Sequence, residues 1–326
     1  MITRFANHTQ ASLPPAMNAL GIALLLALCI APWFGGQFLI HLAVLTALNV
    51  VMVNGLALIG RSGQLSLSHA AFAGIGAYAA VLGAQLTGVG FVTSTIVGMV
   101  ITGVIALALG WVILRLKGVY FVLVTFAFGE LVRLVLLDFA DITGGANGIT
   151  NIPPAELFGF VFDSRTKFFG LALVVALGSI AIMRALFRKP IGHAIDAVAT
   201  NPGLAESTGL NVHRLQVFVF VVGCMLAALG GVLQARYIGY ISPESFNTSI
   251  SVGFIIMLVI GGRNSTWGPL VGAVVLTPLP ELFRGAVQTQ HIFYGAALIV
   301  ILRFLPGGLA SLSARWAQRR NEGASQ

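Results

Sequence analysis

Charged side chains are scarce in this chain. Of its 326 residues, 18 are basic and 10 are acidic, so that 9% are charged while 57% are hydrophobic. A soluble domain has roughly a quarter of its residues charged, because its surface must be hydrated. No Asp, Glu, Lys or Arg lies within residues 5–60 or 62–114, and a helix of about 20 apolar residues crosses the core of a bilayer. The composition therefore excludes a soluble fold and predicts an all-α integral membrane protein.

Sequence motifs of catalysis and metal binding are absent as well. No phosphate-binding loop of the G-x-x-x-x-G-K-[ST] type occurs, and the histidines show no metal-ligand spacing. Cys29 and Cys224 both lie within apolar runs. The net charge of +8 comes from single basic residues between apolar runs, unlike the dense basic face of a nucleic-acid-binding protein. We therefore expect no enzyme activity, no metal, no cofactor and no nucleic-acid partner.

Ten candidate membrane spans result when the chain is divided at its charges and at clusters of Gly, Pro and Asn. They cover residues 17–34, 38–59, 65–86, 91–114, 118–137, 167–187, 215–236, 250–262, 267–283 and 292–305. The eighth and ninth are short and are separated by Gly-Gly-Arg-Asn-Ser at 261–265. Because glycine and asparagine interrupt helices, we expect one or both to be broken or re-entrant.

The basic residues gather at alternate connections between these spans. With the N-terminus in the cytoplasm, thirteen basic residues fall on the cytoplasmic side and five on the other. Basic residues are retained on the cytoplasmic side of membrane proteins, which supports this orientation. It predicts cytoplasmic tails at 1–16 and 306–326, a transmembrane domain at 17–305, a cytoplasmic loop at 188–214 and a loop on the opposite side at 138–166.

Two groups of polar residues stand where hydrocarbon is expected. Gln64, Ser66, Ser68 and His69 open the third span, where two interpretations are open: they cap the helix, or they line a transport path. Glu130 lies in the fifth span, three residues before Arg133. Either the two pair on one helix face and brace the bundle, or Glu130 lines the same path. Other carboxylates within spans are few, which disfavours a proton-coupled transporter.

The cytoplasmic loop at 188–214 reads as two short helices interrupted at Asn201-Pro202-Gly203. A short amphipathic helix without catalytic residues is suited to docking into a groove of a partner protein. A helix lying in the membrane interface fits the same pattern, so both interpretations stay open from the residues alone.

Four blocks of sequence carry a resemblance to a known family. They are residues 63–78 (GQLSLSHAAFAGIGAY), 143–149 (TGGANGI), 205–212 (AESTGLNV) and 261–273 (GGRNSTWGPLVGA). In combination and spacing they resemble the permease subunits of bacterial ABC importers for branched-chain amino acids, specifically the second of the two permeases of such a system. The likeness covers about residues 40–305.

The resemblance implies a multi-pass protein of the bacterial inner membrane, with loop 138–166 in the periplasm. Its expected partners are a second permease, two cytoplasmic ATP-binding subunits, which bind the ATP, and a periplasmic solute-binding protein. Glu206 and Gly209, with Ala205 and Asn201 beside them, are expected to couple the permease to the ATPases. The chain departs from the family pattern at Ser68 and Asn264, where glycine is usual, and at residues 193, 196 and 199, where arginine is common.

Other functions remain open at this level. The same importer could carry urea, short amides, aromatic acids or other amino acids. A protein of another class, a secondary transporter or channel acting alone, would share the same composition. These alternatives differ in whether transport requires ATP and in which solute the binding protein delivers.

Overall fold

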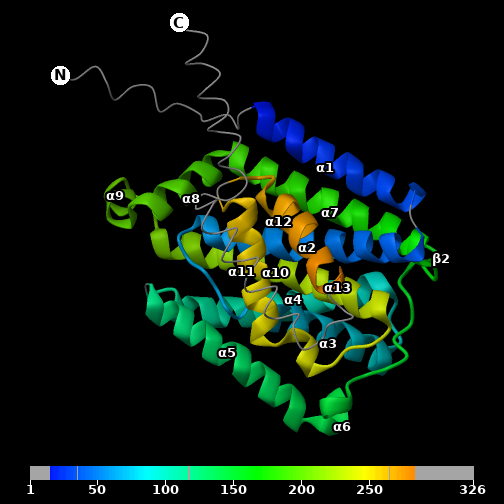
Figure 1. Ribbon diagram of the computed structural model, residues 1–326. Coiled ribbons are helices and arrows are strands. Elements are labelled where there is room, and N and C mark those ends of the chain that lie inside the picture. The colour runs from blue at the N-terminus through cyan, green and yellow to red at the C-terminus, as the bar shows by residue number, and fades with distance from the viewer. Residues whose placement is uncertain (1–14, 35, 117, 264, 283–326) are drawn as a thin grey trace, which may run out of the picture.

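The computed structural model describes residues 15–34, 36–116, 118–263 and 265–282 (Figure 1). The long helices are α1 (Pro15–Phe34), α2 (Gln37–Arg61), α3 (His69–Thr87), α4 (Phe91–Ile113), α5 (Val119–Asp138), α7 (Arg165–Arg188), α10 (Val212–Ile238) and α11 (Thr248–Gly261). Between and after them lie α6 (Ala140–Thr143), η1 (Gly145–Asn147), β1 (Glu156–Leu157), β2 (Phe160–Val161), α8 (Pro190–Thr200), α9 (Pro202–Ser207), η2 (Pro243–Phe246), α12 (Gly268–Leu276) and α13 (Pro278–Leu282).

Seven segments of this part of the chain are long and apolar enough to cross a membrane. They are Gln37–Arg61, His69–Thr87, Phe91–Ile113, Val119–Asp138, Arg165–Arg188, Val212–Ile238 and Pro243–Gly261. They correspond to the second to eighth predicted spans. The first and ninth contain only the shorter apolar stretches Gly21–Ile30 and Gly268–Pro280. The tenth, 292–305, lies outside the described residues, so the number of ten spans stays a prediction.

Two details of the predicted fold are refined. The ninth span is broken at Thr277 into α12 and α13, as expected for a short segment rich in glycine and proline. The loop at 138–166 contains a small antiparallel hairpin in which Glu156 pairs with Val161 and Leu157 with Phe160. Among the described residues, the fold is otherwise helical apart from a single bridge between Ile149 and Ile241.

Helices α2 and α10 form the centre of the molecule (Figure 1). Helix α10 packs along α2, α3 and α4, and α2 also packs along α7. At the crossing of α2 and α10 the two backbones touch, since a Cβ atom on Gly223 would lie 2.6 Å from the carbonyl oxygen of Gly55. Lipid supplies no hydrophobic force between helices, so such close van der Waals contact between small residues holds them together.

Helix α5 lies at one edge of the bundle, far from α1 at the opposite edge (Figure 1). Its buried residues are Phe121, Thr125 and Gly129, which form a single stripe with one residue per turn. The other faces of α5 are exposed in this chain and carry large apolar side chains, among them Leu123 and Leu131. That surface is suited to lipid or to another membrane protein.

The loops between the helices form two groups, each held together by its own contacts, at opposite ends of the bundle. One group brings residues 62–64, then 114, 115 and 118, and residues of the segment 198–216 around a common cavity. At the other end, Arg236 donates hydrogen bonds to the carbonyl oxygen of Pro153 at 3.0 Å and to Ser94 Oγ at 3.3 Å. The grouping coincides with the two sides that the basic residues predict, although which side is cytoplasmic stays a prediction.

Candidate functional site

The predicted third span begins four residues later than its sequence suggests. Helix α2 ends at Arg61, and a turn follows in which the Ser62 and Gly63 amides donate to the carbonyl oxygens of Ile59 and Gly60, both at 3.1 Å. Helix α3 begins only at His69, so Gln64, Ser66 and Ser68 precede it in non-helical backbone. The predicted span at 65–86 therefore corresponds to a helix that starts at His69, because the half-buried Leu65 and Leu67 belong to the linker before it.

The serines of this linker bond to one another rather than capping α3. Ser66 and Ser68 are buried, and their hydroxyl oxygens lie 2.8 Å apart. Ser68 occupies the N-cap position but its side chain makes no capping bond. The free amide of Ala70 instead donates to Ser251 Oγ of α11 at 2.9 Å. Ser251 thus fixes the start of α3 against α11, while a role of the linker serines in lining a path remains a prediction.

His69 is a packing residue at the junction of α2 and α3. Its side chain is fully buried, and Nε2 donates to the carbonyl oxygen of Met52 at 2.8 Å. Gly55 leaves the room for the imidazole, because a Cβ there would lie 3.2 Å from His69 Cε1. His69 Nδ1 is buried without a hydrogen-bond partner among the described residues.

Glu130 and Arg133 pair on one face of α5, as one of the two interpretations of the sequence predicts. Arg133 Nε donates to Glu130 Oε2 at 2.9 Å, and Arg133 Nη1 donates to Glu244 Oε1 at 2.8 Å. Thr248 Oγ1 donates to Glu130 Oε1 at 2.6 Å. The network joins α5 to η2 and to the start of α11, which favours the bracing role.

The loop at 188–214 contains two short helices, as predicted, but the interruption is at Asn201 alone. Pro202 and Gly203 belong to the first turn of α9, where proline is tolerated because its missing amide would be unpaired. Asn201 caps this helix, since its Oδ1 accepts from the Leu204 amide at 3.1 Å. Ala205 is buried against Val198 of α8 and Val212 of α10.

Gly209 ends α9 in the way that its sequence position predicts. Its φ is +87°, the left-handed region that suits glycine. The Gly209 amide donates to the carbonyl oxygen of Glu206 at 2.9 Å, and the Leu210 amide donates to that of Ala205 at 3.2 Å. These two bonds are the Schellman motif of a helix C-terminus. The four residues predicted to couple to the ATPases therefore form one structural unit, α9 with its two caps.

Sequence reasoning missed the ion pair that joins the preceding helix, α8, to α2. Arg61, the last residue of α2, forms a bidentate ion pair with Asp196 of α8 and lies over the ring of Phe187 at 3.6 Å. The sequence offered one signal of this contact, because Asp196 is acidic at a position where arginine is common in the family pattern. The partner on α2 could not be found, because the two residues are 135 positions apart.

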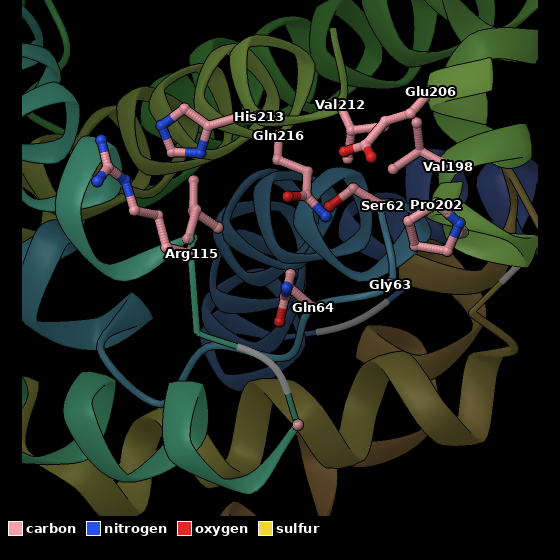
Figure 2. A pocket seen from close by; sticks show the side chains of 13 residues that line it. Ser62, Gly63, Gln64, Arg115, Val198, Pro202, Glu206, Val212, His213 and Gln216 are labelled. Carbon is pink, nitrogen blue, oxygen red and sulfur yellow. The ribbon is translucent and has the colours of Figure 1, made fainter. Parts of the chain in front are cut away.

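A cavity of about 560 Å³ lies between α9 and the turn that follows α2 (Figure 2). We call it the α9 cavity. It is lined by Ser62, Gly63, Gln64, Leu114, Arg115, Gly118, Val198, Ala199, Pro202, Glu206, Val212, His213 and Gln216. Gln64 is the one residue of the five predicted to line a path that belongs to this lining. Glu206 is the one of the four predicted coupling residues that does.

Two glutamine side chains, Gln64 and Gln216, belong to the lining of the α9 cavity although they are only 7% and 8% exposed. His213, another lining residue, has its Nε2 buried without a hydrogen-bond partner among the described residues.

Comparison with known proteins identifies the family. A family model described as "Branched-chain amino acid transport system / permease component" matches residues 38–302. The chain belongs to this permease family. It is thus a multi-pass membrane protein and an ABC-type permease, as the sequence blocks predict.

Individual relatives agree with this assignment. The permease protein LivM of the high-affinity branched-chain amino acid transport system of Escherichia coli K12 is 30% identical, over 93% of this chain and 77% of the relative. LivH of Salmonella typhimurium is also named as a permease protein of a high-affinity branched-chain amino acid transport system. It is 24% identical over 85% of this chain and 93% of the relative. The ribose import permease protein RbsC of E. coli K12 is 25% identical, over 87% and 91%. No solved structure matches the chain significantly.

Proposed function

We propose that this chain, with a second permease, forms the path by which branched-chain amino acids enter the cell across the bacterial inner membrane. Two cytoplasmic ATP-binding subunits supply the energy, and a periplasmic solute-binding protein delivers the amino acid. The observation that carries the proposal is α9, a short helix capped at both ends that follows α8, which an ion pair joins to α2, in a chain whose relatives are permeases of this kind.

The surface of α9 supports a docking role. Leu204 is 64% exposed although it is apolar, whereas the next residue, Ala205, is buried against α8 and α10. An exposed leucine on a rigidly held helix is the kind of group that inserts into a groove of a partner. Closure of the ATPase dimer would then move α9, and through Asp196 and Arg61 it would move the end of α2.

The exposed faces of α5 support assembly with a second permease. Only one stripe of α5 is buried in this chain, at Phe121, Thr125 and Gly129. Thr125 Oγ1 accepts from the Leu67 amide at 3.2 Å and so links α5 to the polar linker before α3. We infer that the translocation path runs along α5 between the two permeases, with Glu130 near its outer end.

Uptake by the assembled importer tests the proposal. The chain would be reconstituted in liposomes with the second permease, the ATP-binding subunits and the cognate binding protein, and uptake of radiolabelled leucine measured with and without ATP. We expect uptake that requires ATP and the binding protein. As a control, an ATP-binding subunit with an inactivated phosphate-binding loop should abolish it.

Two results would contradict the proposal in different ways. Leucine flux through the purified chain alone, without ATP, would make it a channel or secondary transporter. ATP-driven uptake of urea, an amide or an aromatic acid in preference to leucine would keep the importer and change its cargo.

A further inference from the structure

The hairpin of β1 and β2 ends in an aromatic tip. Because Leu157 pairs with Phe160, Phe158 and Gly159 form the turn between the strands. Both have positive φ, +51° at Phe158 and +82° at Gly159, as in a type I′ turn. Asn-Gly is the pair that favours this turn, whereas a bulky side chain at positive φ is strained. Phe158 is also 100% exposed, so neither the turn nor packing against the described residues accounts for a phenylalanine there.

The base of the hairpin is fixed to the helix bundle. Ile152 and Ala155 are buried, and the Phe162 amide donates to the carbonyl oxygen of Ala155 at 2.9 Å. The ring of Phe162 packs against the hydrophobic core, and β1 contacts α4. Residues 157–162 carry no charge. An apolar tip is therefore held at a defined place beside the bundle.

Side chains on both faces of the hairpin are exposed. Phe160 and Val161 are neighbours in β2, so they point to opposite faces. They are 54% and 37% exposed. A single protein surface would cover one face of such a hairpin, whereas fluid lipid can surround the whole tip. Segments that lie in the membrane interface present side chains of this kind, among them phenylalanine and leucine.

The hairpin lies beside an exposed stripe of α7. Lys167, in the first turn of α7, places Nζ 5.4 Å from the centre of the Phe160 ring, and β2 lies at the edge of the molecule beside the start of this helix (Figure 1). Lys167 begins a stripe of exposed residues that continues through Gly170 and Val174 at helical spacing. Since α7 is long and apolar enough to cross the membrane, the hairpin stands where this surface leaves the hydrocarbon.

We propose that the hairpin tip, residues 157–161, inserts into the membrane interface and anchors the start of α7 there. Its partner is the lipid at the boundary between headgroups and acyl chains, which is the outer leaflet in the predicted orientation. Phe158 and Phe160 enter the upper acyl region, while Lys167 keeps its ammonium group at the level of the headgroups. This role is independent of the cargo and of the ATPases.

Spin labelling in nanodiscs of phosphatidylethanolamine and phosphatidylglycerol tests the anchor with both rings in place. In a variant without Cys29 and Cys224, a nitroxide would be attached at Val161→Cys or, as the control, at Asn147→Cys, an exposed position in the same loop. Oxygen concentrates in lipid and a nickel chelate in water, so their effects on the nitroxide report its depth. An interfacial segment lies about 5–10 Å into the boundary region, so the ratio of oxygen to nickel effects should be at least about threefold higher at 161 than at 147.

Removal of the two rings should release the tip from the lipid. Asparagine suits the first position of a type I′ turn and threonine suits a strand, so the double variant Phe158→Asn, Phe160→Thr should keep the hairpin. We expect the ratio at 161 to fall to that at 147, without a fall in the melting temperature of the solubilised protein. Leu204→Asn, which removes an exposed apolar side chain at the other end of the bundle, should leave the ratio at 161 unchanged.

Three results would overturn the proposal. Equal ratios at positions 161 and 147 with both rings in place would show that the tip is in water. A nitroxide at 161 that becomes shielded only when the solute-binding protein is added would make the hairpin a contact for that protein. A high ratio at 161 that persists in the double variant would show that Phe158 and Phe160 do not hold the tip in the lipid.

Discussion

Arg61 and Asp196 join the end of a central helix to the helix before α9. Arg61 Nε lies 3.0 Å from Asp196 Oδ1, and Nη2 lies 2.6 Å from Oδ2. The arginine side chain is 14% exposed and the aspartate 46%, so the pair is half in water. Because Arg61 also covers the ring of Phe187, this contact ties α2, α7 and α8 together at one point.

Asp196→Asn should lower ATP-driven uptake while leaving most of the protein in the membrane. A partly exposed ion pair contributes about 1 kcal/mol or less to stability, so the fold should survive. The same energy changes the ratio between the paired and unpaired positions of α8 by at most about fivefold, so we expect a loss in uptake of at most about fivefold. The measurement is the initial uptake rate divided by the amount of membrane-inserted protein.

A matched control exists at the other end of the molecule. Asp163 and Lys167 form an exposed ion pair of 2.8 Å at the start of α7. Asp163→Asn therefore removes an equivalent charge. We expect uptake by that variant to stay near the wild-type level. Equal losses in both variants would show that the Arg61–Asp196 pair has no special part in coupling.

Gly209→Ala should weaken coupling more than Gly203→Ala. At φ = +87° a Cβ atom costs about 1–2 kcal/mol, whereas Gly203 has no positive φ and an added Cβ there makes only ordinary contact at 3.6 Å with Asn201 Oδ1. Gly209→Val should be more severe still, because a β-branched side chain tolerates this conformation least. Capture of the ATP-binding subunits by tagged permease, with uptake in the same cells, provides the readout.

Normal capture and normal uptake in Gly209→Val would mean that energy enters elsewhere. The coupling role of α9 would then have to be abandoned, and with it the roles of Glu206, Ala205 and Asn201. A loss of both properties in Gly203→Ala as well would point to general damage of the loop.

The sequence predicts the parts of this structure that depend on local chemistry. Long uncharged runs locate the spans, because a helix of apolar residues satisfies its own backbone in lipid. Asn201 and Gly209 locate both ends of α9, because each acts on amides or carbonyls within a few residues.

The parts that the sequence does not reveal depend on distant segments. The cap of α3 comes from Ser251, 181 residues away, so serines beside the helix start were the natural but incomplete candidates. His69 likewise bonds to a backbone carbonyl of α2, which carries no sequence signal. The α9 cavity needs three connections to come together, and no single one of them indicates it.

Gly223→Val should prevent normal folding, whereas Gly178→Val should be tolerated. At Gly223 an added side chain meets the backbone of α2, since its Cβ would lie 2.6 Å from the Gly55 carbonyl oxygen. At Gly178, on α7, no atom lies within 4 Å of an added Cβ. We expect most of the Gly223→Val protein to be lost from the membrane fraction, which quantitative blotting measures. Equal levels of the two variants would contradict the tight crossing of α2 and α10.

Labelling from outside tests the predicted orientation. In a variant without Cys29 and Cys224, single cysteines would replace Asn147 in the loop at 138–166 and Thr200 at the end of α8, both exposed. Because the basic residues place the first outside and the second inside, an impermeant maleimide should label position 147 in intact cells and position 200 only after permeabilisation. The reverse pattern would invert the predicted topology and exclude α9 as a contact for cytoplasmic ATPases.

Glu130→Gln should affect stability rather than recognition of the cargo. The amide can still accept from Thr248 Oγ1, which lies 2.6 Å from Glu130 Oε1, but the ion pair with Arg133 is lost. Since both side chains are partly exposed, at 30% and 25%, the loss should be about 1 kcal/mol or less. We therefore expect a small fall in the melting temperature of the solubilised transporter and an unchanged KM for leucine uptake. Glu244→Gln, which removes only the more exposed partner of Arg133, should have a smaller effect still. An increase of about tenfold in KM with an unaltered melting temperature would instead place Glu130 in contact with the cargo, and the bracing role would be wrong.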